Sequence, residues 1–314
     1  MNPCIDVLWQ ARLAPATRLC KESISVRIFA PAKVNLFLRI VGQRSDGYHL
    51  LDSLMAPVSL YDAIEIQAER REQSELRITL TCDKPDLPTD QSNLAYRAAL
   101  LMCKETETTA IITIDLKKNI PAGAGLGGGS SDAAAVLKAL NRLLSLGMNV
   151  SQLCQLAAQI GADVPFFIPC RLARVSGIGE ILTSFPPLPR HWLVIVVPPF
   201  AVSTPWAYRR FDELSPKVAG LPTEVWPLQI TAQQWPDLGV FVNDLEEAVL
   251  PEHPLIARSK SRLLELGAEM ALMSGSGSAV FGVFTERLQA QQAAATFTDS
   301  EQAFVVTVVE QALE

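Results

Sequence analysis

The chain has 314 residues, of which 49% are hydrophobic and 19% are charged, and its formal net charge is −6. That amount of apolar material can form packed cores, which excludes a mainly disordered or fibrous chain, and the length suits about two domains. The acidic balance, without a visible basic patch, argues against nucleic acid or an anionic membrane as a partner.

The first 24 residues carry charges of both signs and lack the apolar core of a secretory signal. We therefore expect them to form a loosely attached N-terminal extension. No apolar stretch approaches the roughly 20 residues that cross a bilayer. The six cysteines form no C-x-x-C pair, which argues against the common zinc and redox motifs. Together these features predict a cytoplasmic protein with reduced thiols.

Strand and helix patterns follow in the N-terminal half. Alternating or β-branched runs predict five strands, at residues 25–30, 34–41, 62–68, 76–81 and 110–116. A turn signal, Ser45-Asp46-Gly47, follows the second of these runs, and residues 93–103 have helical spacing.

A glycine-rich stretch comes next and is the most informative motif of the chain. Gly123, Gly125, Gly127, Gly128 and Gly129 lack the side chains that would keep a ligand away from the backbone. The helix that follows offers unpaired N–H groups and the positive end of its dipole, and two serines add hydroxyl donors. The pattern predicts a phosphate site. A flexible linker or a plain helix start is the alternative without a function.

Two common nucleotide motifs do not fit this stretch. Gly123, Gly125 and Gly128 match G-x-G-x-x-G, but residues 133–162 contain no Asp or Glu that could hold a ribose. No Gly-Lys-Ser or Gly-Lys-Thr follows the glycines, and the chain lacks the His-Arg-Asp and Asp-Phe-Gly tripeptides of protein kinases. The phosphate site is therefore of another type.

The remaining pattern predicts a change of domain near residue 185. Helical spacing extends to Gly147 and again over residues 150–160, and a proline-rich passage precedes an apolar run at residues 192–197. After an aperiodic loop, the order is helix, strand, turn, strand, helix and strand, at residues 255–266, 270–273, 274–278, 279–284, 286–295 and 303–309. Strands adjacent in the sequence indicate α+β layers and not a doubly wound parallel sheet.

Five segments together resemble the GHMP small-molecule kinases. The glycine-rich stretch resembles their ATP loop, and Met-Ser-Gly-Ser-Gly-Ser-Ala at residues 273–279 resembles their C-terminal glycine motif. Three more segments resemble the branch that acts on a cytidyl alcohol: Pro-Ala-Lys-Val-Asn-Leu-Phe-Leu at 31–38, Arg-Ser-Asp-Gly-Tyr-His at 44–49 and Gly-Ala-Asp-Val-Pro-Phe-Phe at 161–167. The resemblance extends from about residue 25 to the C-terminus and leaves out the loop at 216–236.

The resemblance implies an α+β protein with two domains. After the extension at residues 1–24, residues 25–185 would form an ATP-binding α/β domain like that of a ribosomal protein, and residues 186–314 a ferredoxin-like α+β domain. The implied reaction moves the γ-phosphoryl group of ATP to the 2-hydroxyl of a methylerythritol unit that carries cytidine diphosphate, in the non-mevalonate isoprenoid pathway. ATP would arrive with Mg²⁺ held mainly by phosphates and waters, so no dedicated protein metal site is expected.

The resemblance also assigns roles to residues. Asp163 would be the base that accepts the hydroxyl proton, and Lys33 would keep this carboxylate ionised and stabilise the developing alkoxide. Asn35, on the same strand face as Lys33, would contact the substrate. The residues that would bind ATP are Pro121, Ala122, Gly123, Ala124, Gly125, Leu126, Gly127, Gly128, Gly129, Ser130 and Ser131.

A cytidine pocket is implied by two short segments. Tyr48 and His49 would form one side of it, with the histidine at the edge of the base, while Thr204 and Tyr208 would close the other side, with the aromatic ring stacked on cytosine. The turn that contains Gly275 and Gly277 would approach the ligands near the transferred phosphate. Without the resemblance, these residues would be read as a loop histidine, a core tyrosine and a glycine hairpin.

Three other functions are alternatives for this sequence. A GHMP kinase for a mevalonate-pathway intermediate or a sugar is opposed by the segment at 44–49. A nucleic-acid-binding module rests only on fold analogy and is opposed by the charge of −6. A dinucleotide-dependent oxidoreductase lacks the ribose carboxylate.

Overall fold

The structure is a computed structural model that describes residues 24–71, 75–214, 238–297 and 300–309. The loop predicted at residues 216–236 lies outside the described residues. The extension predicted at residues 1–24 does so too, except for Ile24, where the first strand begins.

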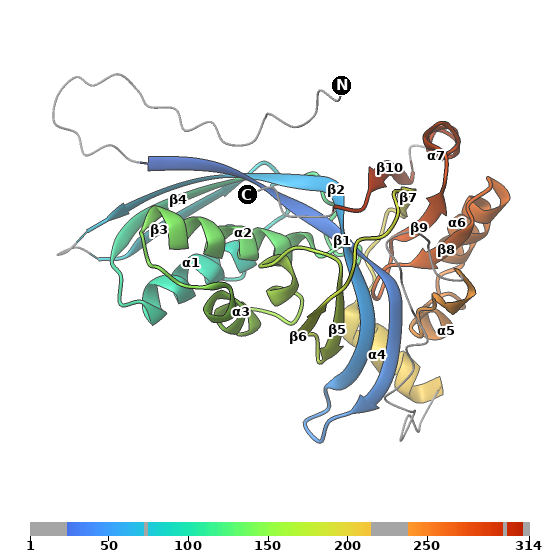
Figure 1. Ribbon diagram of the computed structural model, residues 1–314, viewed down its shortest axis with the longest axis horizontal. Helices are drawn as coiled ribbons and strands as arrows, with labels where there is room; N and C mark the ends of the chain where they lie inside the picture. Colours follow the sequence, from blue (N-terminus) through green and yellow to red (C-terminus); the bar gives the residue numbers. More distant parts are fainter. Residues whose placement is uncertain (1–23, 72–74, 215–237, 298–299, 310–314) are drawn as a thin grey trace.

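The first sheet is built around a hairpin of two long strands (Figure 1). β1 (Ile24–Gln43) and β2 (His49–Arg70) pair antiparallel along their length. One end of β2 pairs with β4, which has β3 parallel to it, and the other end pairs with β5, which pairs with β6. The bounds of these strands are β3 (Arg77–Cys82), β4 (Ala110–Lys117), β5 (Ala173–Gly177) and β6 (Ile181–Ser184).

Three helices cover one face of this sheet, as Figure 1 shows. They are α1 (Leu94–Glu105), α2 (Gly128–Leu143) and α3 (Val150–Ala158), and a 3-10 turn (Pro165–Phe167) follows α3. Asn93 caps α1 by accepting from Ala95 N, and Asn149 begins α3 with a capping box. The alternating pattern of β4 buries Ile112 and Ile114 against these helices.

The second sheet has the order β10-β7-β9-β8 with all pairs antiparallel. Its strands are β7 (Trp192–Val197), β8 (Met270–Met273), β9 (Val280–Phe284) and β10 (Gln302–Thr307). The helices of this half are α4 (Thr204–Leu214), α5 (Glu246–Val249), α6 (Pro254–Glu265) and α7 (Arg287–Ala294), with a 3-10 turn at Leu238–Val240. This β-α-β-β-α-β order is ferredoxin-like, so the predicted α+β fold is confirmed.

The two sheets share an apolar core. Val34 and Leu54 of the long hairpin pack in one cluster with Leu193, Leu272 and Phe281 of the second sheet. The last strand also returns to the hairpin, where the backbone N–H of Val309 donates to the carbonyl of Pro57 at 2.8 Å. The domain boundary at residues 185 and 186 stays a prediction.

Several elements differ from their prediction. The strands expected at 25–30 and 34–41 are one strand, β1, which shifts its register between Pro31 and Ala32 and again between Asn35 and Phe37. Such bulges bend a strand without ending it. The first part of β2 was not predicted, because residues 52–58 are all buried and show no alternation. The β5–β6 hairpin and α4 were not predicted either.

Candidate active site

A cavity of about 1070 Å³ lies between the two halves of the molecule. Most of the predicted site residues line it, namely Lys33, Asn35, Tyr48, His49, residues 121–130, Asp163, Thr204, Tyr208 and Gly275. Ser131 and Gly277 do not. Ser131 is buried in α2 with a hydroxyl that has no partner, and a Cβ on Gly277 would lie 2.8 Å from the sulfur of Met273. Residues far apart in the sequence therefore converge on one cavity.

The glycine-rich side of the cavity is formed by residues 121–130. Gly123, Gly125 and Gly127 have positive φ angles of 67°, 76° and 72°. These backbone conformations favour glycine, because the Cβ atom of any other residue would clash with the backbone there. Gly127 caps α2, so the predicted loop ends at this residue and residues 128–131 form the first helical turn. Gly128, Gly129 and Ser130 of this turn line the cavity, and the first backbone N–H groups of a helix have no partner within it.

A buried charge cluster supports this side. Lys118 donates to the carboxylates of both Asp62 and Asp132, and Asp62 also accepts from the backbone N–H groups of Asn119 and Ile120. Burial raises the pKa of Asp132 to about 7, although Lys118 opposes this shift. Burial lowers the pKa of Lys118, but the two carboxylates outweigh it and raise that pKa. Sequence reasoning missed this cluster, for which the signal was a lysine at the end of an apolar strand and an aspartate in an apolar helix.

Lys33 lies beside the glycine-rich side, at the bulge of β1. Its Nζ donates to Oδ1 of Asn35 at 2.5 Å and lies 3.8 Å from Oδ2 of Asp163. The Lys33 side chain is 4% exposed, whereas that of Asp163 is 41% exposed. Burial lowers the pKa of Lys33, and the negative charge of Asp163 acts against it. The arrangement places a fixed cation next to a carboxylate that a ligand can reach.

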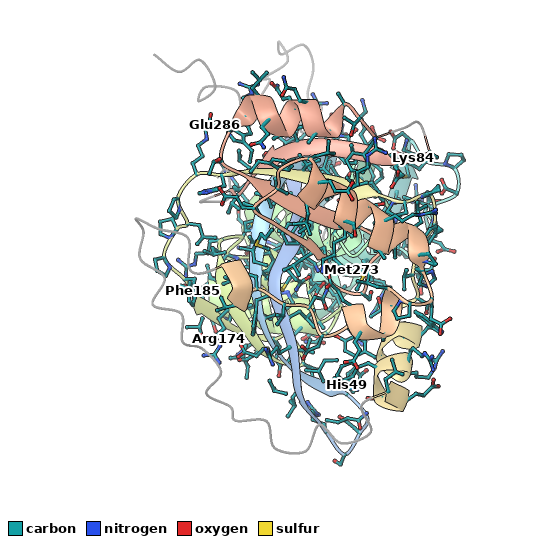
Figure 2. The ribbon with its side chains drawn as sticks, turned by 90° about the vertical axis from the view of Figure 1, so that its right-hand side faces the viewer. His49, Lys84, Arg174, Phe185, Met273 and Glu286 are labelled. Atoms are coloured by element: carbon teal, nitrogen blue, oxygen red, sulfur yellow. The ribbon has the colours of Figure 1, made fainter. Side chains whose placement is uncertain are left out.

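The aromatic side of the cavity is formed by Tyr48 and His49 from β2 and its preceding turn, and by Thr204, Tyr208 and Asp212 from α4. The rings of His49 and Tyr208 stack, with centroids 4.8 Å apart and an angle of 27°. His49 Nε2 lies 2.7 Å from Oδ1 of Asp212. Figure 2 shows His49 near the tip of the long hairpin, beside α4.

The two tyrosines of the aromatic side differ in exposure. Tyr48 is 60% exposed, whereas burial raises the pKa of the Tyr208 hydroxyl above its usual range. Asp212 was missed by sequence reasoning. Its signal was the spacing of Thr204, Tyr208 and Asp212, which are four residues apart and so share one face of a helix.

No group of three or more His, Cys, Asp or Glu side chains that could hold a metal ion occurs among the described residues. Within the same residues, no helix is both long and apolar enough to span a bilayer. Cys82, Cys103, Cys154 and Cys170 are free thiols, and burial raises the pKa of Cys103 to about 11. Cys4 and Cys20 lie outside the described residues.

Family models match the chain in both halves. The model described as "GHMP kinases N terminal domain" matches residues 93–170, and "GHMP kinases C terminal" matches residues 229–300. The first match contains the glycine-rich stretch and Asp163, and the second contains the turn at residues 274–278.

Relatives over most of the chain share one name, 4-diphosphocytidyl-2-C-methyl-D-erythritol kinase. The protein of Methylacidiphilum infernorum is 47% identical over 264 residues, which cover 83% of this chain and 87% of that protein. The protein of Geobacter metallireducens is 40% identical and covers 90% of this chain and 98% of its own length. A crystal structure of a 4-(cytidine 5'-diphospho)-2C-methyl-D-erythritol kinase superposes with a TM-score of 0.72 at 35% identity, over 90% of this chain and 99% of that one.

These matches extend over both sheets and over the cavity between them, and GHMP kinases use ATP as phosphoryl donor. The chain therefore belongs to the family of 4-diphosphocytidyl-2-C-methyl-D-erythritol kinases within the GHMP kinases, and it is an ATP-dependent small-molecule kinase.

Proposed function

We propose that this kinase transfers the γ-phosphoryl group of ATP to the 2-hydroxyl of 4-diphosphocytidyl-2-C-methyl-D-erythritol, with Asp163 as the base and Lys33 as the charge stabiliser. One observation carries the proposal. Lys33 and Asp163 lie 3.8 Å apart, and both line the cavity that the glycine-rich side and the aromatic side share. A phosphate bound by the glycine-rich side and an alcohol bound by the aromatic side would meet at Lys33 and Asp163.

The two residues have complementary roles. A carboxylate within hydrogen-bond reach of the acceptor hydroxyl takes its proton as the oxygen attacks the γ-phosphorus. Asp163 is exposed enough to contact a ligand, and the ammonium of Lys33 lies 3.8 Å from its carboxylate. Lys33 also offsets the negative charge that develops on the attacking oxygen. Most of the rate enhancement in phosphoryl transfer comes from such positioning and charge stabilisation.

Mg²⁺ fits the donors on the glycine-rich side. Such an ion keeps several waters and binds mainly to the phosphates of the nucleotide, so it needs few protein ligands. Ser130 lines the cavity in the first turn of α2, and its hydroxyl is an oxygen ligand of the required type. When bound, the ion would neutralise charge on the β- and γ-phosphates. We further propose that ATP is bound by residues 121–131, although Ser131 would act only from within the helix.

The aromatic side suits a cytidyl group. A cytosine ring offers a π-face and a polar edge, which call for an aromatic plate and for hydrogen-bonding groups. Tyr208 supplies a ring and His49 a polar edge, while Tyr48 is exposed at the rim of the cavity. His49 covers one face of the Tyr208 ring in this structure. A base that stacks on this face of Tyr208 would therefore take the place of His49.

A substrate panel tests the proposal. Release of ADP is measured with the cytidyl substrate, mevalonate, phosphomevalonate and galactose as acceptors. We expect turnover with the cytidyl substrate at least a hundredfold above that with any other acceptor. Equal or faster turnover with mevalonate, its phosphate or the sugar would assign the chain to another alcohol substrate within the GHMP kinases.

A further inference from the structure

One buried amide outside the predicted site connects three parts of the cavity wall. Asn243 precedes α5, is 4% exposed and does not line the cavity itself. Its Nδ2 donates to the carbonyl of Met273 at 2.7 Å and to that of Gly275 at 2.8 Å, while its Oδ1 accepts from the backbone N–H of Leu245 at 3.0 Å. Every hydrogen-bonding atom of this amide group is thus engaged with the backbone.

The segment around Asn243 is attached to β1, the strand that carries Lys33. The N–H of Leu38 donates to the carbonyl of Val242 at 2.8 Å, and the N–H of Asp244 donates back to Leu38 at 2.9 Å. The Asp244 carboxylate accepts from the N–H of Ile40 at 2.9 Å. Asn243 is therefore held at a fixed place along β1, and its amide group holds residues 273–275 at the same place.

The turn at residues 273–275 in turn contacts the glycine-rich side. Ser274 Oγ donates to the carbonyl of Gly125 at 3.0 Å and accepts from the N–H of Asn35 at 3.4 Å. The backbones approach so closely that a Cβ on Gly125 would lie 2.2 Å from the carbonyl oxygen of Ser274. Figure 2 shows Met273, at the start of this turn, in the centre of the molecule.

The same turn also lies against the proposed catalytic pair. A Cβ on Gly275 would lie 3.3 Å from Nζ of Lys33 and 3.4 Å from Oδ1 of Asn35. Thr204 on α4 is hydrogen-bonded to Ser276 at 2.8 Å, so the aromatic side is attached to this turn as well. A shift of the turn would therefore move the phosphate loop, Lys33 and α4 relative to one another.

We propose that Asn243 is a positioning residue for phosphoryl transfer, because its side-chain amide fixes the turn at residues 273–275 between β1 and the glycine-rich side. Asn243 does not contact the reacting atoms. Its effect on turnover rests on the proposed function, whereas its effect on nucleotide binding does not.

The test compares two isosteric substitutions. Asn243→Asp replaces the amide donor by an oxygen that faces two carbonyl oxygens, so both hydrogen bonds are lost. Asn141→Asp is the matched control, because the Asn141 amide also donates to a backbone carbonyl and accepts from a backbone N–H, both of Met148 at 2.9 Å, but lies outside the cavity lining. We expect Asn243→Asp to lower kcat for the cytidyl substrate at least tenfold and Asn141→Asp to change it less than twofold, at a temperature where both are folded.

A second measurement keeps the two proposals separate. Calorimetric titration with a non-hydrolysable ATP analogue should show at least threefold weaker binding for Asn243→Asp than for Asn141→Asp. If the wild-type chain does not phosphorylate the cytidyl substrate, the proposed function fails and this titration alone decides the role of Asn243. Should Asn243→Asp not fold, Asn243→Ala and Asn141→Ala replace the pair. Values of kcat and of analogue affinity that match between the Asn243 and Asn141 variants would overturn the proposal.

Discussion

The glycine-rich side and the aromatic side of the cavity are built differently. The glycine-rich side is lined mainly by residues with small side chains or none, includes three glycines with positive φ and lies beside a buried charge cluster. On the aromatic side, side chains from β2 and α4 face the cavity, and one of them, Tyr48, is 60% exposed. A site made of backbone can bind any phosphate of the right shape, whereas side chains can be exchanged to select one alcohol.

The largest expected effect is at the junction of the two sides. Asp163→Asn keeps the shape of the side chain but cannot accept a proton, so we expect kcat to fall about a hundredfold or more. Affinities for ATP and for the cytidyl substrate should stay close to wild type in calorimetric titrations. Near wild-type kcat in this variant would remove Asp163 from the base role.

Lys33→Met tests the partner of Asp163. Turnover should again fall strongly, and Lys33→Met combined with Asp163→Asn should be much less than multiplicatively slower, because both residues act on one proton transfer. Lys138→Met is a suitable control, since Lys138 donates to the carbonyl of Phe167 outside the cavity lining. Fully multiplicative losses would show that Lys33 and Asp163 act on separate steps.

A smaller effect is expected on the glycine-rich side. Gly125→Ala places a Cβ against the carbonyl oxygen of Ser274 and forces an alanine to a φ of 76°. We expect ATP affinity to weaken about tenfold, which corresponds to about 1.4 kcal/mol. Gly147→Ala is the control, because Gly147 has a similar φ of 70° but no atom within 4 Å of its Cβ position. Equal losses of ATP affinity in the two variants would mean that backbone strain alone, and not the close approach to Ser274, is responsible.

On the aromatic side, we expect a substitution to weaken binding of the cytidyl substrate and not of ATP. Losing a base–aromatic stack costs about 1–3 kcal/mol, so Tyr208→Ala should raise KM for the cytidyl substrate about tenfold or more and leave KM for ATP nearly unchanged. Tyr208→Phe keeps the ring and should be nearly silent. If Tyr208→Ala changes both KM values equally, or neither, the contrast between the two sides does not hold.

The smallest effect concerns pH and the charge cluster beneath the glycines. Burial raises the pKa of Asp132 to about 7 in the folded protein, whereas an aspartate in an unfolded chain has a pKa of about 3.9. The folded state therefore binds the extra proton between these values, and the stability contributed by protonated Asp132 is lost as the pH rises from about 4 through about 7.

Asp132→Asn should remove this dependence. In urea unfolding at pH 5 and pH 8, the free energy of unfolding of the wild type relative to the variant should decrease at the higher pH. The exposed Asp86→Asn variant corrects for the change in net charge. A relative stability that is the same at pH 5 and pH 8 would mean that Lys118 keeps Asp132 ionised over this range.

The sequence predicted the regular parts of the fold well where the burial pattern is regular. The alternating β4 and the capped α1 and α3 appear close to their predicted bounds. The first part of β2 could not be found in this way, because its residues are buried on both faces and a continuous apolar run has no period. Two strands were predicted at residues 25–30 and 34–41, but the bulge between Pro31 and Ala32 lets β1 continue to Gln43.

The site, like the fold, divides into a part that a local sequence pattern predicts and a part that depends on tertiary packing. The sequence alone determined that a glycine-rich stretch precedes a helix and predicted a phosphate site there, because glycines act through the backbone and need no distant partner. Only the tertiary structure decided that Lys33 lies beside Asp163, that Asp212 contacts His49 and that Asn243 fixes the turn at residues 273–275. These side chains act through partners up to 163 residues away, and such contacts depend on how the two sheets pack, which no local pattern records.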